Sequence, residues 1–138
     1  MQMRDSDVDL LSEVVFRFFS GLDQHDHRSV AKLMARKGTW QRQGAELVGP
    51  EAVLTALEQR DPKRHTAHLV SNLRVETVGE NSARLRYYMT AFESVADADQ
   101  TLGPPKMAGV RDCTDDLILE DGHWRIGCKR SKLLLPAM

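Results

Sequence analysis

The sequence lacks the features that mark several classes of protein. It contains no apolar run near the roughly 20 residues that a membrane-spanning helix needs. It also contains no glycine-rich phosphate loop and no serine or cysteine nucleophile motif. The net charge is only -1, and no basic run stands out, so nothing favours nucleic acid or an anionic membrane. We therefore expect neither kind of partner.

Cysteine is also scarce. The only two, Cys113 and Cys128, fall in predicted neighbouring strands and could form one disulfide, although two free buried thiols are the expectation in a reducing compartment. The opening residues, 1–9, are acidic and polar, unlike a signal peptide with its basic and apolar regions. These features predict a cytoplasmic protein.

What the sequence does contain suits one folded domain. Its 138 residues are 41% hydrophobic and 28% charged, which is ordinary for a globular chain and sufficient for a core. No linker, repeat or low-complexity segment divides it. We expect a single domain over residues 1–138.

Apolar residues at helical spacing predict three helices in the first half. The first covers about residues 7–24, and the second follows a cap at Asp26 and stops at Lys37-Gly38. The third begins at Gly49-Pro50 and ends at Asp61-Pro62. Their predicted buried faces are Val8, Leu11, Val15, Phe18, Phe19 and Leu22, then Val30, Leu33 and Met34, then Val53, Leu54 and Leu57.

The second half changes to strand periodicity. Residues 83–92 alternate between apolar and other side chains, and turns are predicted at 79–81 and at Asp121-Gly122. Strands near 109–120 and 123–134 flank the second turn. Helices followed by strands predict an α+β domain, with helices packed on one face of an antiparallel sheet.

Five short segments, in their order, carry a family resemblance. They are 18–23 (Phe-Phe-Ser-Gly-Leu-Asp), 38–40 (Gly-Thr-Trp), 48–53 (Val-Gly-Pro-Glu-Ala-Val), 64–72 (Arg-His-Thr-Ala-His-Leu-Val-Ser-Asn) and 121–126 (Asp-Gly-His-Trp-Arg-Ile). Together they resemble the SnoaL-like branch of the nuclear-transport-factor-2-like (cystatin-like) superfamily, over nearly the whole chain. The resemblance implies a cone-like roll, in which three N-terminal helices pack on a curved, mainly antiparallel sheet around a pocket.

The resemblance also implies an acid–base pair. Asp23 and His68 match the carboxylate and the histidine that abstract a proton in scytalone dehydratase and bile-acid 7-alpha-dehydratase. Such a carboxylate orients the imidazole and favours its protonated form after proton abstraction. The plain alternatives are that Asp23 only ends the first helix and that His68 is a hydrogen-bonded core residue.

The strand around His68 poses a conflict of phase. The more apolar set, Leu69, Leu73 and Val75, would face away from His68 in a regular strand. A bulge or a twist near Ser71-Asn72 would resolve the conflict, since one extra residue reverses the facing, and we predict one there.

Three positions depart from the dehydratase pattern. Phe18 and Trp40 stand where those enzymes carry tyrosines, and Ala91 stands where some relatives carry another acid. Losing a donor to a developing oxyanion typically costs on the order of a hundredfold or more in rate. We therefore do not expect the specific dehydratase reaction.

The remaining candidate residues suit a ring-bearing or polyketide-like ligand. Phe18, Trp40, Tyr87, Met89, Ala91 and Leu117 would line the pocket, or would equally serve as core. Tyr87 is the best remaining hydroxyl donor. Asp115 and Arg130, on adjacent strands, are expected to form a structural ion pair or to contact a polar ligand group.

No metal or cofactor is expected. His25 and His27 lie in a turn, and His65 with His68 offers a second close pair, but neither set has three or four converging ligands.

The sequence thus predicts a domain that binds a small apolar molecule, with cofactor-free dehydration, isomerisation or cyclisation as its chemistry. The alternative is a non-catalytic binding or assembly subunit, like the β subunits of ring-hydroxylating dioxygenases. Outward-facing Tyr88, Phe92 and Ile118 favour a homodimer formed through the sheet.

Overall fold

The structure, a computed structural model, describes residues 5–138. The first four residues, part of the polar opening segment and of the expected 1–138 domain, lie outside the described residues. The helices are α1 (Asp5–Asp23), α2 (His27–Ala31) and α3 (Gly49–Glu58). The strands are β1 (Met34–Arg42), β2 (Ala45–Val48), β3 (Arg64–Val78), β4 (Ser82–Val95), β5 (Lys106–Glu120) and β6 (His123–Leu135).

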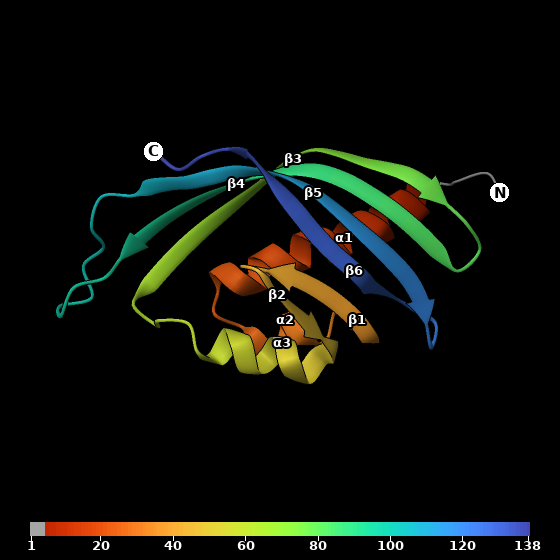
Figure 1. Ribbon diagram of the computed structural model, residues 1–138, viewed down its shortest axis with the longest axis horizontal. Coiled ribbons are helices and arrows are strands. Elements are labelled where there is room, and N and C mark those ends of the chain that lie inside the picture. Colours follow the sequence, from red (N-terminus) through yellow and green to blue (C-terminus); the bar gives the residue numbers. More distant parts are fainter. Residues whose placement is uncertain (1–4) are drawn as a thin grey trace.

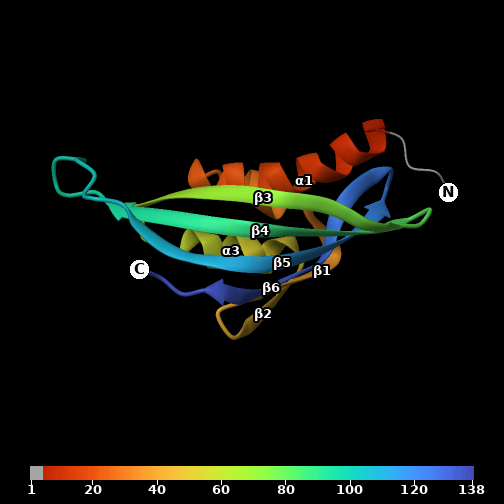
Figure 2. The same ribbon diagram turned by 90° about the horizontal axis from the view of Figure 1, so that it is seen from above.

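The strands form one sheet in the order β2-β1-β6-β5-β4-β3. Every neighbouring pair is antiparallel except β1 with β6. The long strands β3 to β6 curve into an arch, and the helices lie beneath it (Figures 1 and 2). The predicted class is confirmed: helices pack against a curved, mainly antiparallel sheet.

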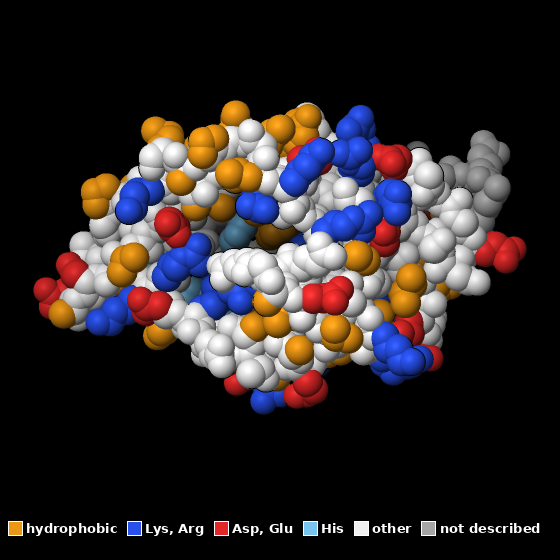
Figure 3. All heavy atoms as spheres, viewed as in Figure 1, with side chains coloured by type: hydrophobic (Ala, Val, Ile, Leu, Met, Phe, Trp, Pro, Cys, Tyr) orange, Lys and Arg blue, Asp and Glu red, His pale blue; other side chains and the backbone are white. Residues whose placement is uncertain are grey.

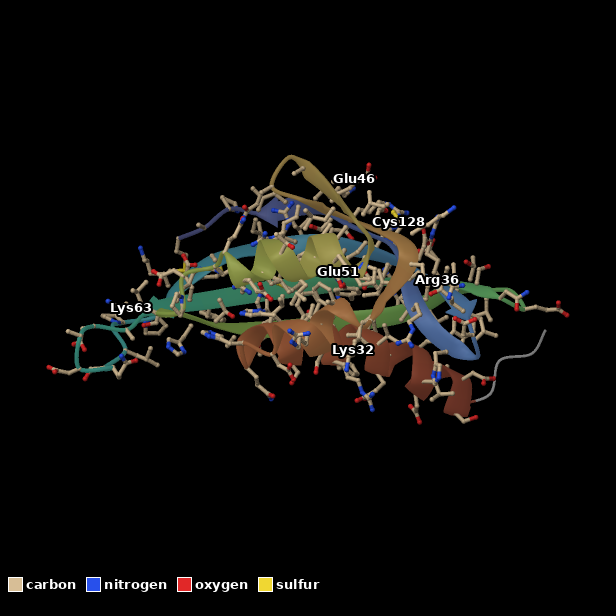
Figure 4. The ribbon with its side chains drawn as sticks, turned by 90° about the horizontal axis from the view of Figure 1, so that it is seen from below. Lys32, Arg36, Glu46, Glu51, Lys63 and Cys128 are labelled. Atoms are coloured by element: carbon tan, nitrogen blue, oxygen red, sulfur yellow. The ribbon has the colours of Figure 1, made fainter. Side chains whose placement is uncertain are left out.

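The core fills the space between the helices and the concave side of the sheet. Viewed from below, α1 and α3 lie over the sheet (Figure 4), with α1 against β3 and β6 and α3 against β1. The predicted apolar face of α1 supplies much of the core, because residues three and four apart share one side of a helix. The largest fully buried side chains are Tyr87, Phe18, Leu11, Leu57, Leu85, Leu117, Ile126, Val15, Val30, Val53 and Asp115.

The predicted second helix is too long. α2 begins after the predicted Asp26 cap, whose side chain accepts from the Ser29 N–H, but it ends at Ala31. Met34 is already in β1, opposite Ile126 of β6. Gly38 lies within this strand, where a Cβ would collide with the Ile126 carbonyl oxygen. Its role is therefore close strand packing, and it does not stop a helix.

The predicted bulge in β3 is confirmed. The register with β4 shifts between Ser71 and Arg74, and Asn72 has a positive φ of 53°. Val70 before the bulge and Leu73 after it both pack against the core. Leu69 lies on the other face and is 54% exposed. The bulge thus lets His68 share the inner face with the apolar residues that follow it.

Cys113 and Cys128 are free thiols, the first buried and the second half-buried. Within residues 5–138, no helix is both long and apolar enough to cross a membrane.

Candidate functional site

A cavity of about 720 Å³ opens between the concave side of the sheet, the end of α1 and the β1–β2 hairpin. Figure 3 shows the hollow, with apolar and histidine atoms inside it and Lys and Arg side chains around it. The lining residues are Phe19, Leu22, Trp40, Gln41, Arg42, Gln43, Gly44, Ala45, Glu46, Arg60, Arg64, His68, Tyr87, Met89, Ala91, Ala108, Arg111, Cys113, Lys129, Arg130 and Ser131. A space of this size suits a small organic molecule.

Asp23 and His68 meet at the wall of this cavity. Asp23 is the last residue of α1, and His68 lies on the inner face of β3 before the bulge. Nδ1 of His68 is 2.6 Å from Oδ1 of Asp23. The same carboxylate accepts the backbone N–H of His68 at 2.9 Å and the hydroxyl of Thr66 at 2.8 Å. Three donors therefore hold the Asp23 side chain against β3.

This arrangement fixes which imidazole nitrogen carries the proton. An ionised carboxylate can only accept, so Nδ1 must donate to Asp23 and the neutral ring keeps its lone pair on Nε2. His68 lines the cavity with a side chain only 9% exposed. Burial lowers the pKa of His68 below its ordinary 6.5, and the hydrogen bond to Asp23 opposes that shift. A neutral imidazole at pH 7 is able to accept a proton.

A second buried cluster lies beside the cavity. The Tyr87 hydroxyl donates to Asp115 at 3.0 Å, and the Lys129 ammonium donates to Tyr87 at 2.8 Å and to Asp115 at 2.9 Å. The ammonium also lies 4.2 Å from the centre of the Phe18 ring. Burial, followed by the charge of Asp115, raises the pKa of Tyr87 well above its ordinary value. The phenol therefore stays protonated, and its O–H already donates its hydrogen bond to Asp115.

The expected ion pair of Asp115 with Arg130 is wrong. Asp115 pairs with Lys129, its direct neighbour in the sheet, while Arg130 pairs with Asp116 at 2.9 Å. The cause is a register shift between β5 and β6 beside Gly127, which moves the residues of β6 from Cys128 to Leu133 by one place.

The other predicted site residues divide into two groups. Trp40, Tyr87, Met89 and Ala91 line the cavity together with His68. Phe18 and Leu117 do not line it; both are fully buried in the core, where Phe18 packs edge-on against Trp40. Asp23 is not among the lining residues, and it contacts the lining residue His68.

The sequence analysis missed Lys129, Arg42 and Arg60. The inward phase of β6 would have indicated Lys129 only if the shift beside Gly127 had been known. Arg42 ends β1 and Arg60 follows α3, where a charged residue carries no signal of facing a cavity. Their place becomes apparent only in the folded chain, where the β1–β2 hairpin, the segment after α3 and the start of β3 line the same cavity.

Three histidines gather outside the cavity. His25 stacks on His65 at 5.1 Å and on His27 at 6.2 Å. Among residues 5–138, no group of three or more His, Cys, Asp or Glu side chains is arranged to hold a metal ion.

Solved structures share this fold at low sequence identity. A protein provisionally named a scytalone dehydratase, from Novosphingobium aromaticivorans, superposes with a TM-score of 0.82 at 17% identity, over 96% of this chain and 87% of that one. A variant of Rv3472, a Mycobacterium tuberculosis protein of unknown function, gives 0.78 at 21%, over 94% and 77%. A nuclear-transport-factor-2-like protein with a cystatin-like fold, also from N. aromaticivorans, gives 0.75 at 20%, over 94% and 82%. These likenesses establish the fold alone.

No protein of curated function matches the chain in sequence. The sequence model of the SnoaL-like domain, in contrast, matches residues 6–130. This range includes Asp23 on α1 and His68 on β3, and it ends at Arg130 within the cavity-lining part of β6. The chain therefore belongs to the SnoaL-like domain family.

Proposed function

We propose that the chain binds an apolar small molecule in the cavity and catalyses a proton transfer on it without a cofactor. Dehydration, isomerisation and cyclisation are the reactions of this kind. The observation that carries the proposal is the 2.6 Å contact of His68 Nδ1 with Asp23, which leaves Nε2 as the basic nitrogen of a cavity-lining ring. The fold shared with a provisionally named scytalone dehydratase supports it.

In this mechanism, Nε2 of His68 removes a proton from a carbon of the bound molecule. The imidazolium that forms is stabilised by the Asp23 carboxylate, and its proton is then delivered to a leaving oxygen or to another carbon. The half-buried rings and thioether of Trp40 and Met89 hold the apolar part of the molecule and exclude water.

Lys129 takes over part of the role expected of the missing tyrosines. Lys129 as a residue is only 5% exposed and lines the cavity, and its ammonium donates to the Tyr87 hydroxyl. Because Asp115 already pairs with this ammonium, the positive charge can stabilise negative charge on a substrate oxygen only where that oxygen lies closer to the ammonium than to the carboxylate. Tyr87, our expected donor, would contribute only by its hydrogen bonds within this cluster, because its O–H already donates to Asp115.

The proposal is tested with 5-nitrobenzisoxazole, a small apolar molecule that reports on any positioned base. The base removes the ring C–H proton, the N–O bond breaks, and a coloured cyanonitrophenolate forms with the bond electrons on its oxygen. We expect the protein to accelerate this ring opening, and His68→Ala to remove at least nine-tenths of the acceleration. His123→Ala is the matched control, because His123 is exposed in the β5–β6 hairpin.

Equal rates for the wild type and His68→Ala, with both variants folded by circular dichroism, would rule out His68 as the base. A loss of rate in His123→Ala of the same size would show that the effect is not local to the cavity.

We further propose that the protein is a homodimer formed through the outer face of the sheet. Tyr88 and Phe92 are half-buried on that face, and the neighbouring Leu69 is more than half exposed. The same apolar surface supports the second candidate function, a non-catalytic assembly subunit, which would use the sheet as its interface.

A further inference from the structure

The cavity carries far more positive charge than the chain as a whole. Its lining contains six basic side chains and one acidic side chain, while the chain has a net charge of -1. The basic residues are Arg42, Arg60, Arg64, Arg111, Lys129 and Arg130. The acidic one, Glu46, is exposed on the β1–β2 hairpin (Figure 4).

Half of these cations are neutralised by the protein itself. Arg64 binds Glu93 at 2.7 Å, Lys129 binds Asp115 at 2.9 Å, and Arg130 binds Asp116 at 2.9 Å.

The guanidinium groups of Arg42 and Arg60 have no such partner. Both side chains are half-buried, and neither forms a hydrogen bond or ion pair with any residue in the range 5–138. Arg42 instead lies over the Trp40 ring at 5.3 Å. Arg111 also forms no ion pair with a carboxylate in the described part of the chain, and it donates to the Ser131 hydroxyl at 2.7 Å. A half-buried guanidinium without an anion is costly, since it has lost part of its hydration and gained no counter-charge.

Arg42 lies near Arg60, and Arg60 lies near the base. Burial is the largest cause that lowers the pKa of Arg42 and of Arg60, and repulsion from Arg64 acts in the same direction on both. Arg60 and Arg64 also act on His68, whose pKa they lower. The Asp23 carboxylate favours charged Arg60 at a distance, but its oxygens are occupied by Thr66 and His68. Among residues 5–138, no carboxylate therefore forms an ion pair with Arg42 or Arg60 at this end of the cavity.

We propose that the ligand is an organic oxyanion, a carboxylate or a phosphate monoester on an apolar body, whose anionic group is held by Arg42 and Arg60. The planar guanidinium fork matches both groups. The apolar body would then extend along Trp40 and Met89 past His68. This inference rests on the proposed function, because it names the class of molecule that the same cavity binds.

The test compares three probes that share one ring system: 2-naphthoate, 2-naphthyl phosphate and the neutral 2-naphthamide. Affinities are measured by calorimetry, and occupancy of the cavity by the shift of the His68 ring in NMR spectra. We expect at least one anion to bind tenfold or more tightly than the amide, because hydrogen bonds from a guanidinium to an anion are stronger than those to a neutral amide. The preferred anion identifies whether a carboxylate or a phosphate is taken.

Variants assign the effect to the two side chains. Arg42→Gln and Arg60→Gln should each lower the affinity for the preferred anion about tenfold and change the affinity for the amide by less than twofold. Arg17→Gln is the control, because it removes one positive charge from an exposed site on α1. Added salt should lower the affinity for the anion and leave the affinity for the amide unchanged.

The proposal is overturned if no anion outbinds the amide, including the case in which none binds. It is also overturned if Arg17→Gln weakens the anion as much as the two cavity variants do. If the amide binds as well as the anions and still shifts His68, the anion inference fails while the proposed function stands. A His68→Ala variant that keeps its full elimination rate makes the proposed function fail whatever the anions do.

Discussion

At the scale of single residues, the Asp23 carboxylate forms three hydrogen bonds with β3. It closes α1, ties Thr66 and the His68 backbone to the helix, and fixes the proton on His68 Nδ1. The two plain alternatives for these residues, a helix end and a hydrogen-bonded core histidine, describe part of the same geometry. They do not by themselves account for a histidine that lines a 720 Å³ cavity.

We expect Asp23→Asn to separate the structural role from the chemical one. The amide oxygen can still accept from the backbone of β3, but the neutral side chain no longer stabilises an imidazolium and can donate to Nδ1, which places the proton on Nε2. The rate of 5-nitrobenzisoxazole opening should fall about a hundredfold, with a change of less than about 2 kcal/mol in the free energy of unfolding. A variant of unchanged rate would contradict the orienting role.

At the scale of the elements, bulges decide which side chains face the cavity. The bulge in β3 could be predicted, because the apolar phase of Leu73 and Val75 disagreed with the family position of His68. The shift between β5 and β6 could not, because Cys128, Lys129 and Arg130 show no alternation that fixes their facing. The end of α2 could not be predicted for a related reason: apolar Leu33 and Met34 fit the continuation of a helix as well as they fit the approach to a strand.

The bulge in β3 gives a prediction on stability. Asn72 has a φ of 53°, a conformation that asparagine and glycine adopt readily and a β-branched residue does not. Asn72→Val should lower the free energy of unfolding by about 1–2 kcal/mol, while Asn72→Gly should change it by less than about 1 kcal/mol. Ser71→Val, at the neighbouring exposed strand position, is the control, and urea unfolding measures all three. Equal effects of valine at both positions would show that the positive φ is not required.

At the scale of the whole molecule, the two faces of the arched sheet carry different side chains. The concave face holds the cavity and the core, and the convex face carries Tyr88, Phe92 and Leu69. The overall class followed from the order of helices and strands, because amphipathic periodicity depends only on local sequence. The charge of the cavity did not, since Arg42, Arg60 and Arg111 come from segments that meet only in the folded chain.

The convex face predicts the state of assembly. Sedimentation at micromolar concentration should give twice the chain mass, and Leu69→Glu with Phe92→Glu should give the monomer, because buried like charges oppose association. Leu10→Glu, on the exposed side of α1, should leave the dimer intact. A wild-type monomer under the same conditions would contradict the proposed interface.

The central claim is that His68 is a neutral base with its free nitrogen in the cavity, and nitrogen NMR of labelled protein tests it most directly. We predict that His68 at pH 7 is the neutral tautomer protonated on Nδ1, and that it titrates below pH 6.5, because burial disfavours the charged ring. As the pH is lowered through this range, the unfolded chain binds the proton more readily than the folded one. The free energy of unfolding should therefore decrease as the pH decreases. A ring that is charged at pH 7, or that carries its proton on Nε2, would contradict the account.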